Sequence, residues 1–408
     1  MVEIIDEPYF QGDNAQFTFH RPNLTKESVL IEEKNNTRVL TFNAARTVKQ
    51  MIQLEHTLEE WEKDDVVELV ILKLLNLQLR SFNVNLKTDQ ENLSAKGDDQ
   101  RTCQFVDSVK MGREGFYRTY WLTYHLATYK KPIIALWNGV FLGTSLGLPM
   151  MCMYSIATEK AMYSMSEAGL GFHTDIGASY FLPRLPGYLG EYLGLTGASL
   201  NGAELLACGF ATHFVPSKSL WKLENLLLAL DTGESDVLRS TLDELSIVVE
   251  PPECSVLNRL DVIDRCFSKN SVEEIMEAIV LEKANGSDWL QNVYKSLQRS
   301  SPTGLKQTLR SIREGRNKTL FGCIRQEYRL TVNALRSTIS TDLWEAVRAT
   351  TINKDKTPKW KPATLAEVTE DKVYTVFQTL GLDEIQLPLE GVLPRWSGKF
   401  QSMIHHRL

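Results

Sequence analysis

The stretch between Lys131 and Glu159 contains no charged residue, and it constrains the fold more than any other part of the sequence. A stretch of this length can span a bilayer when it forms one continuous apolar helix. Here turn-forming and polar residues interrupt it, namely Pro132, Asn138, Gly139, Gly143, Thr144, Ser145, Gly147 and Pro149. Because these residues divide it into a strand, a turn and a short helix, the sequence predicts buried core rather than a membrane span.

Strand and helix patterns alternate on the N-terminal side of this core stretch. The expected elements are, in order, strands at 29–33 and 39–42 joined by a polar turn, a helix at 48–62, a strand at 66–72 and a helix at 116–129. Residues 76–112 mix polar and charged residues without a clear period, which predicts a loop-rich excursion. The sequence therefore predicts an α/β fold for this part of the chain.

Helix patterns dominate the C-terminal part of the chain. Pro251-Pro252 is the clearest breaker, and four amphipathic helices are expected after it, at 271–282, 288–298, 301–314 and 320–333. Three short helices are expected before it, at 177–185, 188–195 and 202–207. The predicted division is an N-terminal arm at 1–27, an α/β domain at 28–250, a helical region at 251–375 and a tail at 376–408.

Composition narrows the classes of partner and cofactor. Lys and Arg number 45 against 51 Asp and Glu, a formal net charge of −6, so no long-range field favours nucleic acid or an anionic membrane. The six cysteines include no C-x-x-C pair, which predicts reduced thiols rather than a zinc site or a disulfide framework. Sequence motifs typical of phosphate loops, dinucleotide sites, serine esterases and zinc proteases are also absent.

The two ends of the chain bear on its location. The first residues, Met1 to Pro8, are acidic and lack an apolar core, unlike a secretory or mitochondrial presequence. The last three, His406-Arg407-Leu408, resemble the S-K-L peroxisomal address, with a bulky His in place of a small residue. The expected location is therefore peroxisomal or cytosolic.

Four features have both a chemical and a plain structural interpretation. The turn Gly143–Gly147 follows a buried strand, so its backbone N–H groups either hold an oxyanion or simply start a helix. Glu167 has apolar neighbours that raise a carboxyl pKa toward acid/base use, unless it is a solvated loop residue. Asp175 either caps the following helix or points into a pocket with Glu167. His173 either acts as a base or packs as a hydrogen-bonded core residue.

A longer pattern surrounds these residues. Met165-Ser-Glu167 and the segment Gly171–Val215 resemble the 3-hydroxyisobutyryl-CoA hydrolase family of the crotonase superfamily, particularly its plant members. Further support comes from 260–267, 301–306, 311–316 and 354–360, so that the resemblance runs from about Val29 to Val368. It implies a crotonase-like spiral of ββα units, here 28–250, followed by the helical region.

The resemblance also implies roles for individual residues. Glu167 matches the family's Glu that attacks the acyl carbon or activates water, and Asp175 matches the Asp that contacts the hydroxyl end of the substrate. The thioester oxygen is expected between backbone amides near Gly143 and Thr144 and near Asn83 and Val84. Thr119 stands where the family usually has a substrate-binding Glu.

A further position separates two reaction classes. Enoyl-CoA hydratases use a second carboxylate at the end of the Gly-rich turn, where this chain has Gly147, so the resemblance favours thioester hydrolysis over hydration. The leading hypothesis is hydrolysis of 3-hydroxyisobutyryl-CoA in valine breakdown. The expected partner is the acyl-CoA substrate, and neither a metal nor a cofactor other than the CoA of the substrate is expected. Self-association of the chain is possible on this hypothesis. The alternative is a catalytically weakened relative that binds acyl-CoA or serves as an assembly subunit, because the family's Gly-Gly-Gly turn is Gly143-Thr144-Ser145 here.

Overall fold

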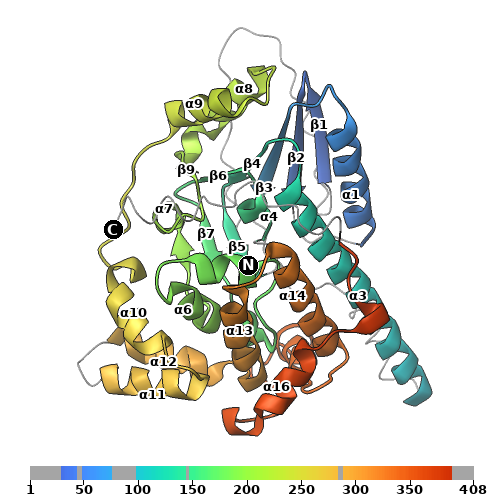
Figure 1. Ribbon diagram of the computed structural model, residues 1–408, viewed down its shortest axis with the longest axis vertical. Coiled ribbons are helices and arrows are strands. Elements are labelled where there is room, and N and C mark those ends of the chain that lie inside the picture. The colour runs from blue at the N-terminus through green and yellow to red at the C-terminus, as the bar shows by residue number, and fades with distance from the viewer. Residues whose placement is uncertain (1–28, 44–47, 76–97, 144–146, 284–287, 388–408) are drawn as a thin grey trace.

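A six-stranded sheet forms the centre of the N-terminal half (Figure 1). The structure is a computed structural model that describes residues 29–43, 48–75, 98–143, 147–283 and 288–387. The strand order is β1 (Val29–Lys34), β2 (Thr37–Asn43), β3 (Leu69–Leu75), β4 (Ile133–Trp137), β6 (Tyr154–Ala157) and β9 (His213–Phe214). β1 and β2 are antiparallel, which confirms the predicted hairpin, and the remaining pairs are parallel.

A second, smaller sheet receives the chain directly after two strands of the first. β5 (Val140–Leu142) follows β4, β7 (Met162–Ser164) follows β6, and β8 (Leu200–Asn201) pairs with β7. The uncharged stretch thus becomes β4, β5, α4 (Gly147–Met151) and β6, as the interruptions by Pro and Gly predict. The chain passes repeatedly from the large sheet to the small one and then into a helix.

The inner strands β3, β4 and β6 are buried on both faces, so they are mainly hydrophobic along their length, whereas the edge strand β1 is exposed and contains Glu32, Glu33 and Lys34. In β3, Leu69 and Ile71 pack with residues of α8 and α9 on one face, whereas Val70 and Leu72 belong to the main core on the other face. Figure 1 shows α8 and α9 beside one face of the sheet and α1 and α3 beside the other.

Helices make up most of the remaining described chain. Those before the proline pair are α1 (Val48–Lys63), α3 (Asp98–Thr128), α4, α5 (Ala178–Phe181), α6 (Leu189–Thr196), α7 (Gly202–Ala207), α8 (Leu220–Ala229) and α9 (Ser235–Leu245). Those after it are α10 (Leu260–Phe267), α11 (Val272–Lys283), α12 (Asp288–Arg299), α13 (Pro302–Gly315), α14 (Leu320–Leu335), α15 (Asp342–Val347) and α16 (Glu370–Phe377). The four predicted C-terminal amphipathic helices match α11 to α14 within two residues at each end.

Two sequence-based boundaries are wrong, each for a local reason. The predicted strand at 66–72 begins only at Leu69, because Asp64 holds the preceding turn by accepting from the amides of Val66 and Val67. The predicted loop at 76–112 ends early, because α3 begins at Asp98. Residues 98–112 lack an apolar period. They continue the packed part of α3, and each residue added to an existing helix gains one backbone hydrogen bond.

The helical region packs onto the sheet domain through one continuous hydrophobic core. Phe181 of α5, Ile312 of α13 and Cys323 of α14 belong to the same cluster as the sheet residues. Helix α13 lies directly against the chain at 172–179. Glycines at 304 and 315 allow this close approach, since a Cβ at either position would overlap the carbonyl oxygen of Phe172 or Ser179. The last strand, β9, ends at Phe214, and α8 and α9 lie between it and the proline pair.

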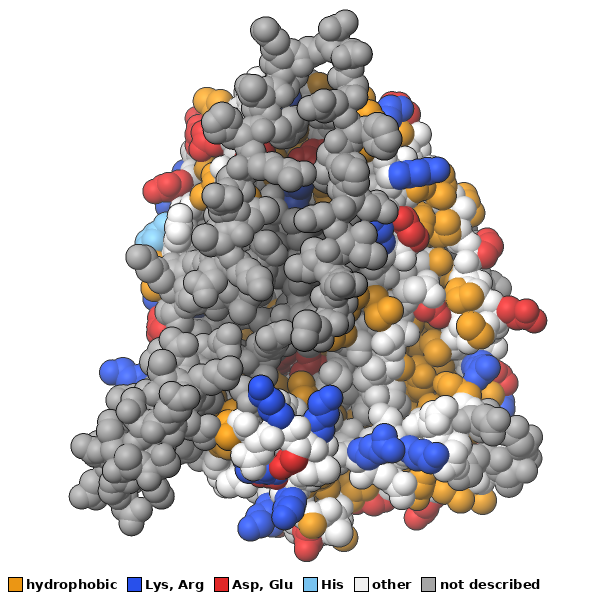
Figure 2. Space-filling model, turned by 180° about the vertical axis from the view of Figure 1, so that it is seen from behind, with side chains coloured by type: hydrophobic (Ala, Val, Ile, Leu, Met, Phe, Trp, Pro, Cys, Tyr) orange, Lys and Arg blue, Asp and Glu red, His pale blue; other side chains and the backbone are white. Residues whose placement is uncertain are grey.

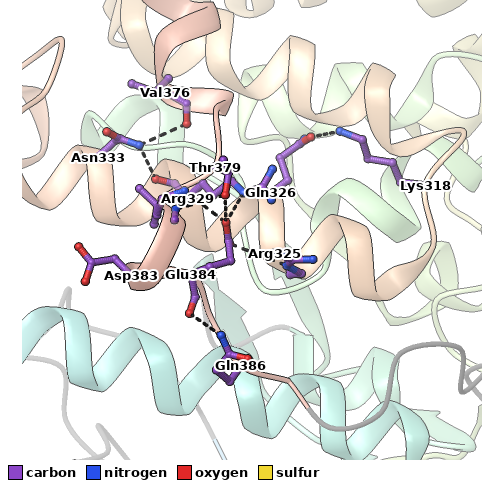
Figure 3. Close-up of polar contacts among 12 residues, drawn as sticks. Lys318, Arg325, Gln326, Arg329, Asn333, Val376, Thr379, Asp383, Glu384 and Gln386 are labelled. Atoms are coloured by element: carbon purple, nitrogen blue, oxygen red, sulfur yellow. Dashed lines mark hydrogen bonds and ion pairs between the residues drawn. The ribbon is translucent and has the colours of Figure 1, made fainter.

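Residues 378–387 lie within the region predicted as a tail, and they pack against α14 and α3. Figure 3 shows Glu384 close to Arg325 and Arg329, which project from α14. Arg329 Nε donates to Glu384 Oε2 at 2.8 Å, and Tyr117 of α3 donates to the carbonyl of Gln386 at 3.1 Å. The arm at 1–27 and residues 388–408 lie outside the described chain.

The described surface shows no extended area of one charge on the upper part of the face in Figure 2, where acidic and basic side chains are interspersed. Lys and Arg side chains gather nearer its lower margin. Over the described ranges, no helix has both the length and the hydropathy that crossing a bilayer requires. All five cysteines whose side chains are described are free of disulfides.

Candidate functional site

Glu167 is buried at the start of a short helical turn, η2 (Glu167–Leu170), three residues after β7 ends. Only 3% of the residue is exposed, and neither carboxylate oxygen has a hydrogen-bond partner among the described residues. Burial raises the pKa of Glu167 to about 8, and the nearby charge of Glu327 adds to the increase. An unpartnered buried carboxyl group is costly to keep, which points to a role beyond folding.

Gly143 lies beside this carboxyl group. A Cβ built on Gly143 would stand 3.0 Å from Glu167 Oε1, and the backbone of Gly143 has φ +64°, a conformation that side chains disfavour. The glycine therefore brings the backbone after β5 close to Glu167. The structure thus places together two of the residues that the sequence singled out, Gly143 and Glu167.

Asp175 is completely buried on the turn between η2 and α5. Its Oδ2 lies 3.3 Å from the hydroxyl of Tyr120 on α3, and its Oδ1 has no partner among the described residues. Burial raises the pKa of Asp175 well above its usual value, and the charges of Glu167 and Glu327 raise it further. The side chain makes no capping bond to α5, so of the two sequence interpretations the capping one is wrong.

His173 is a core residue rather than an available base. Its Nδ1 lies 2.9 Å from the carbonyl oxygen of Thr174, and its Nε2 lies 3.2 Å from Thr331 Oγ1. Burial lowers the pKa of His173 to about 4, so the ring is neutral at physiological pH. This confirms the interpretation of His173 as a packed, hydrogen-bonded residue.

Glu327 of α14 takes the capping role that Asp175 does not. Its Oε2 accepts from Gly177 N at 2.7 Å, and its Oε1 accepts from Ser179 N at 2.8 Å and Ser179 Oγ at 2.6 Å. Glu327 is not among the residues that the sequence patterns singled out. The available indication was a charged residue on the buried stripe of α14, in register with Leu320 and Cys323.

Thr119 lies on α3, one residue before Tyr120, and it is buried. Its hydroxyl donates to the carbonyl of Gly115 on the same helix at 2.9 Å, and it also approaches Met51 Sδ. Thr144, Asn83 and Val84, the other predicted substrate contacts, lie outside the described residues. Their roles, and that of Thr119, stay predictions.

The described residues thus bring three carboxyl groups into one buried region, on η2, on the turn before α5 and on α14. Raised pKa values suit such groups to acid/base or nucleophilic work near neutral pH. These raised pKa values therefore support chemistry by carboxyl groups. No cluster of three or more His, Cys, Asp or Glu in the described ranges is arranged to hold a metal ion.

The sequence is similar to a known protein family and to several individual proteins. A family model described as enoyl-CoA hydratase/isomerase matches residues 38–377. 3-hydroxyisobutyryl-CoA hydrolase-like protein 5 of Arabidopsis thaliana is 44% identical over 387 residues, which cover 93% of this chain and 96% of the relative. Human mitochondrial 3-hydroxyisobutyryl-CoA hydrolase is 35% identical, over 88% of this chain and 90% of that protein.

Two further similarities bear on fold and on function. The crystal structure of a carnitinyl-CoA dehydratase from Mycobacterium thermoresistibile superposes with a TM-score of 0.73 at 28% identity, covering 89% of this chain and 99% of that one. The small ribosomal subunit protein mS47 of Arabidopsis thaliana is 34% identical, over 91% of this chain and 87% of that protein. The similar proteins thus include enzymes of acyl-CoA metabolism and a ribosomal component.

Proposed function

Because the chain belongs to the enoyl-CoA hydratase/isomerase family, we propose that it is a thioester hydrolase that converts 3-hydroxyisobutyryl-CoA to 3-hydroxyisobutyrate and CoA. The predicted fold, a crotonase-like α/β spiral followed by a helical region, is confirmed by the family match and the structural similarity. The hydrolase names of its relatives support the reaction, and valine catabolism is the pathway that this substrate implies.

One observation carries the proposal: Glu167 is buried beside Gly143 with both carboxylate oxygens unpartnered. In its ionised form, which is a minority at neutral pH because the pKa is about 8, the carboxylate can attack the acyl carbon or take a proton from water. In the net reaction water adds to the acyl carbon, the C–S bond breaks, and CoA leaves as a thiolate that takes up a proton. The backbone amides near Gly143 would hold the oxyanion that forms on the thioester oxygen.

The substrate supplies the only CoA in this scheme, and we propose no further cofactor. Carboxyl groups and backbone amides suffice for acyl transfer to water, as they do for nucleophilic and oxyanion catalysis in general. The proposed partner is therefore the acyl-CoA molecule itself, and self-association of the chain stays a prediction.

Free-thiol release from 3-hydroxyisobutyryl-CoA by the purified protein tests the proposal. Release that Glu167→Gln abolishes would support it. A well-folded wild-type protein that binds acyl-CoA but releases no thiol would contradict it, and would favour the alternative of an assembly subunit, the kind of role that the name of mS47 describes for that relative. A scaffold alone gives no reason to bury Glu167 unpartnered, so hydrolysis is the better supported function.

We propose a peroxisomal or cytosolic location only on the sequence of the two chain ends, and the names of some relatives point instead to mitochondria. Localisation of a fluorescent fusion at the N-terminus, with and without His406–Leu408, decides the matter. Peroxisomal import that the truncation abolishes would support the peroxisomal location.

A further inference from the structure

Helix α14 contacts the site through two polar side chains one turn apart, Glu327 and Thr331. Both lie on its buried stripe, although polar groups there cost free energy unless they are hydrogen-bonded. Glu327 bonds to the turn that follows Asp175, and Thr331 bonds to His173 and Tyr120. One helix of the C-terminal region therefore contacts the Asp175 segment on both sides.

The turn that Glu327 holds is strained. Ile176, directly after Asp175, has φ +56°, which is unfavourable for a β-branched residue and costs on the order of 1–3 kcal/mol. Such a conformation persists only when its surroundings impose it. The amides of Gly177 and Ser179 both bond to Glu327, and the amide of Ala178 between them donates to the carbonyl of Asp175. Glu327 is thus the side chain that fixes where Asp175 lies.

The hydrogen-bond geometry also indicates charge. Both oxygens of Glu327 accept from protein donors, Oε2 from Gly177 N and Oε1 from Ser179 N and Oγ, and hydrogen bonds of this kind favour the ionised form of the carboxyl group. The groups that act on this carboxylate among the described residues are Ser179 and Gly177, and neither is a cation. Burial raises the pKa of Glu327 to about 7, and the hydrogen bonds from Gly177 and Ser179 oppose part of that increase.

Proton counting bears on the state of Asp175. The carbonyl of Thr174 can only accept, so His173 Nδ1 carries the ring proton and Nε2 accepts from the Thr331 hydroxyl. Thr331 Oγ1 can then accept from Tyr120, at 2.8 Å. The Tyr120 hydroxyl also lies 3.3 Å from Asp175 Oδ2, and its one proton serves either this contact or the contact to Thr331. When the proton goes to Thr331, the contact to Asp175 is a hydrogen bond only if Asp175 itself carries a proton.

We propose that Glu327 is a positioning residue for the thioester reaction: as an anion it fixes the turn after Asp175 and keeps Asp175 protonated at Oδ2, so that the unpartnered Oδ1 of a neutral Asp175 meets the substrate as a hydrogen-bond acceptor. The catalytic part of this inference rests on the proposed hydrolase function. The titratable groups that its charge affects are Glu167, Asp175, Tyr120 and the Cys323 thiol on its own helix.

Infrared difference spectroscopy tests the protonation without any catalysis. The spectrum of the wild type minus that of Asp175→Asn at neutral pH is expected to contain a C=O band of a protonated carboxyl group. In the Glu327→Gln background that band should disappear at a lower pH than in the wild type. Absence of the band at neutral pH, or a pH dependence that Glu327→Gln leaves unmoved, would overturn the proposal whether or not the protein hydrolyses thioesters.

Kinetics test the positioning role. We expect Glu327→Gln to lower kcat on the order of a hundredfold through misplacement of Asp175, with a smaller change in KM, and to shift the pH–rate profile toward lower pH. Glu327→Asp keeps the charge, so it should lower kcat without that shift. The matched control is Glu204→Gln, since Glu204 is also a buried carboxylate that accepts from a backbone amide and a serine hydroxyl, away from the site.

The outcomes separate the two hypotheses. A Glu327→Gln protein with wild-type kcat and pH profile, and only a lower unfolding temperature, would reduce Glu327 to a structural residue and contradict the inference. A wild type without thiol release would contradict the proposed function, whereas the infrared result would still decide the protonation of Asp175.

Discussion

The turn that carries Glu167 and the turn that carries Glu384 both place a carboxylate in the protein interior, but the two carboxylates differ in their partners. Glu384 Oε2 accepts from Arg329 at 2.8 Å, from Thr379 Oγ1 at 3.2 Å and from Leu380 N at 3.4 Å, as Figure 3 shows in part. Glu167 has no such partner and no cation beside it among the described residues. The first arrangement stabilises the fold, whereas the second leaves a reactive group available to a substrate.

The largest expected effect of this difference is on catalysis. Glu167→Gln removes the proposed nucleophile or base and should lower kcat for thioester hydrolysis by on the order of a thousandfold or more. Glu384→Gln should leave kcat within about twofold of the wild type, because Glu384 lies outside the reacting groups. Thiol release measured on both variants checks the comparison, and equal losses in the two variants would break it.

The close approach of Gly143 to Glu167 gives the next largest effect. In Gly143→Ala the new methyl group meets Glu167 Oε1 and the backbone is strained at φ +64°, so we expect a kcat loss on the order of a hundredfold. Gly381→Ala is the matched control, since Gly381 has φ +61° but nothing within 4 Å of the added Cβ. Rates and unfolding temperatures of both variants separate the contact from the strain. A similar kcat in both would show that the contact is unimportant.

For Glu384, the expected effect is on the free energy of unfolding rather than on catalysis. Arg329→Leu leaves the buried carboxylate of Glu384 with fewer hydrogen-bond partners. We expect it to lower the free energy of unfolding by about 2 kcal/mol, which is less than for a fully buried ion pair because the Arg329 side chain is partly exposed to water. Its kcat should not change. Chemical denaturation together with the hydrolysis assay provides the check. Unchanged stability would mean that this pair contributes nothing to the fold.

The unpaired carboxyl group of Glu167 should cost stability in a pH-dependent way. Its folded pKa of about 8 exceeds its usual 4.5, so its contribution to stability is full below pH 4.5 and is lost as the pH rises to about 8. Glu167→Gln, which cannot ionise, should therefore gain stability relative to the wild type over this window, by about 1.4 kcal/mol for each pH unit between 4.5 and about 8. Unfolding curves at several pH values measure it. A constant difference across pH would contradict the raised pKa.

Local patterns were sufficient for most of the secondary structure. Apolar spacing placed α1 and the C-terminal helices, and the polar turn at Lys34–Asn36 placed the first hairpin. The start of α3 could not be predicted in this way, because residues 98–112 show no buried face in their sequence pattern. The resemblance of the segment from Met165 to Val215 to a known family indicated the fold and singled out Glu167 and Asp175.

Residue type and order by themselves determined the uncharged core stretch, the α/β class and the candidate carboxyl groups, because these depend on hydrophobic period, turn residues and motif spacing. Only the tertiary structure decided that Glu327, some 150 residues after Gly177, caps the turn that carries Asp175. Hydrogen bonding and desolvation depend on distance in space rather than in sequence, so the partners and pKa values of these carboxyl groups exist only once α14 has packed against the site.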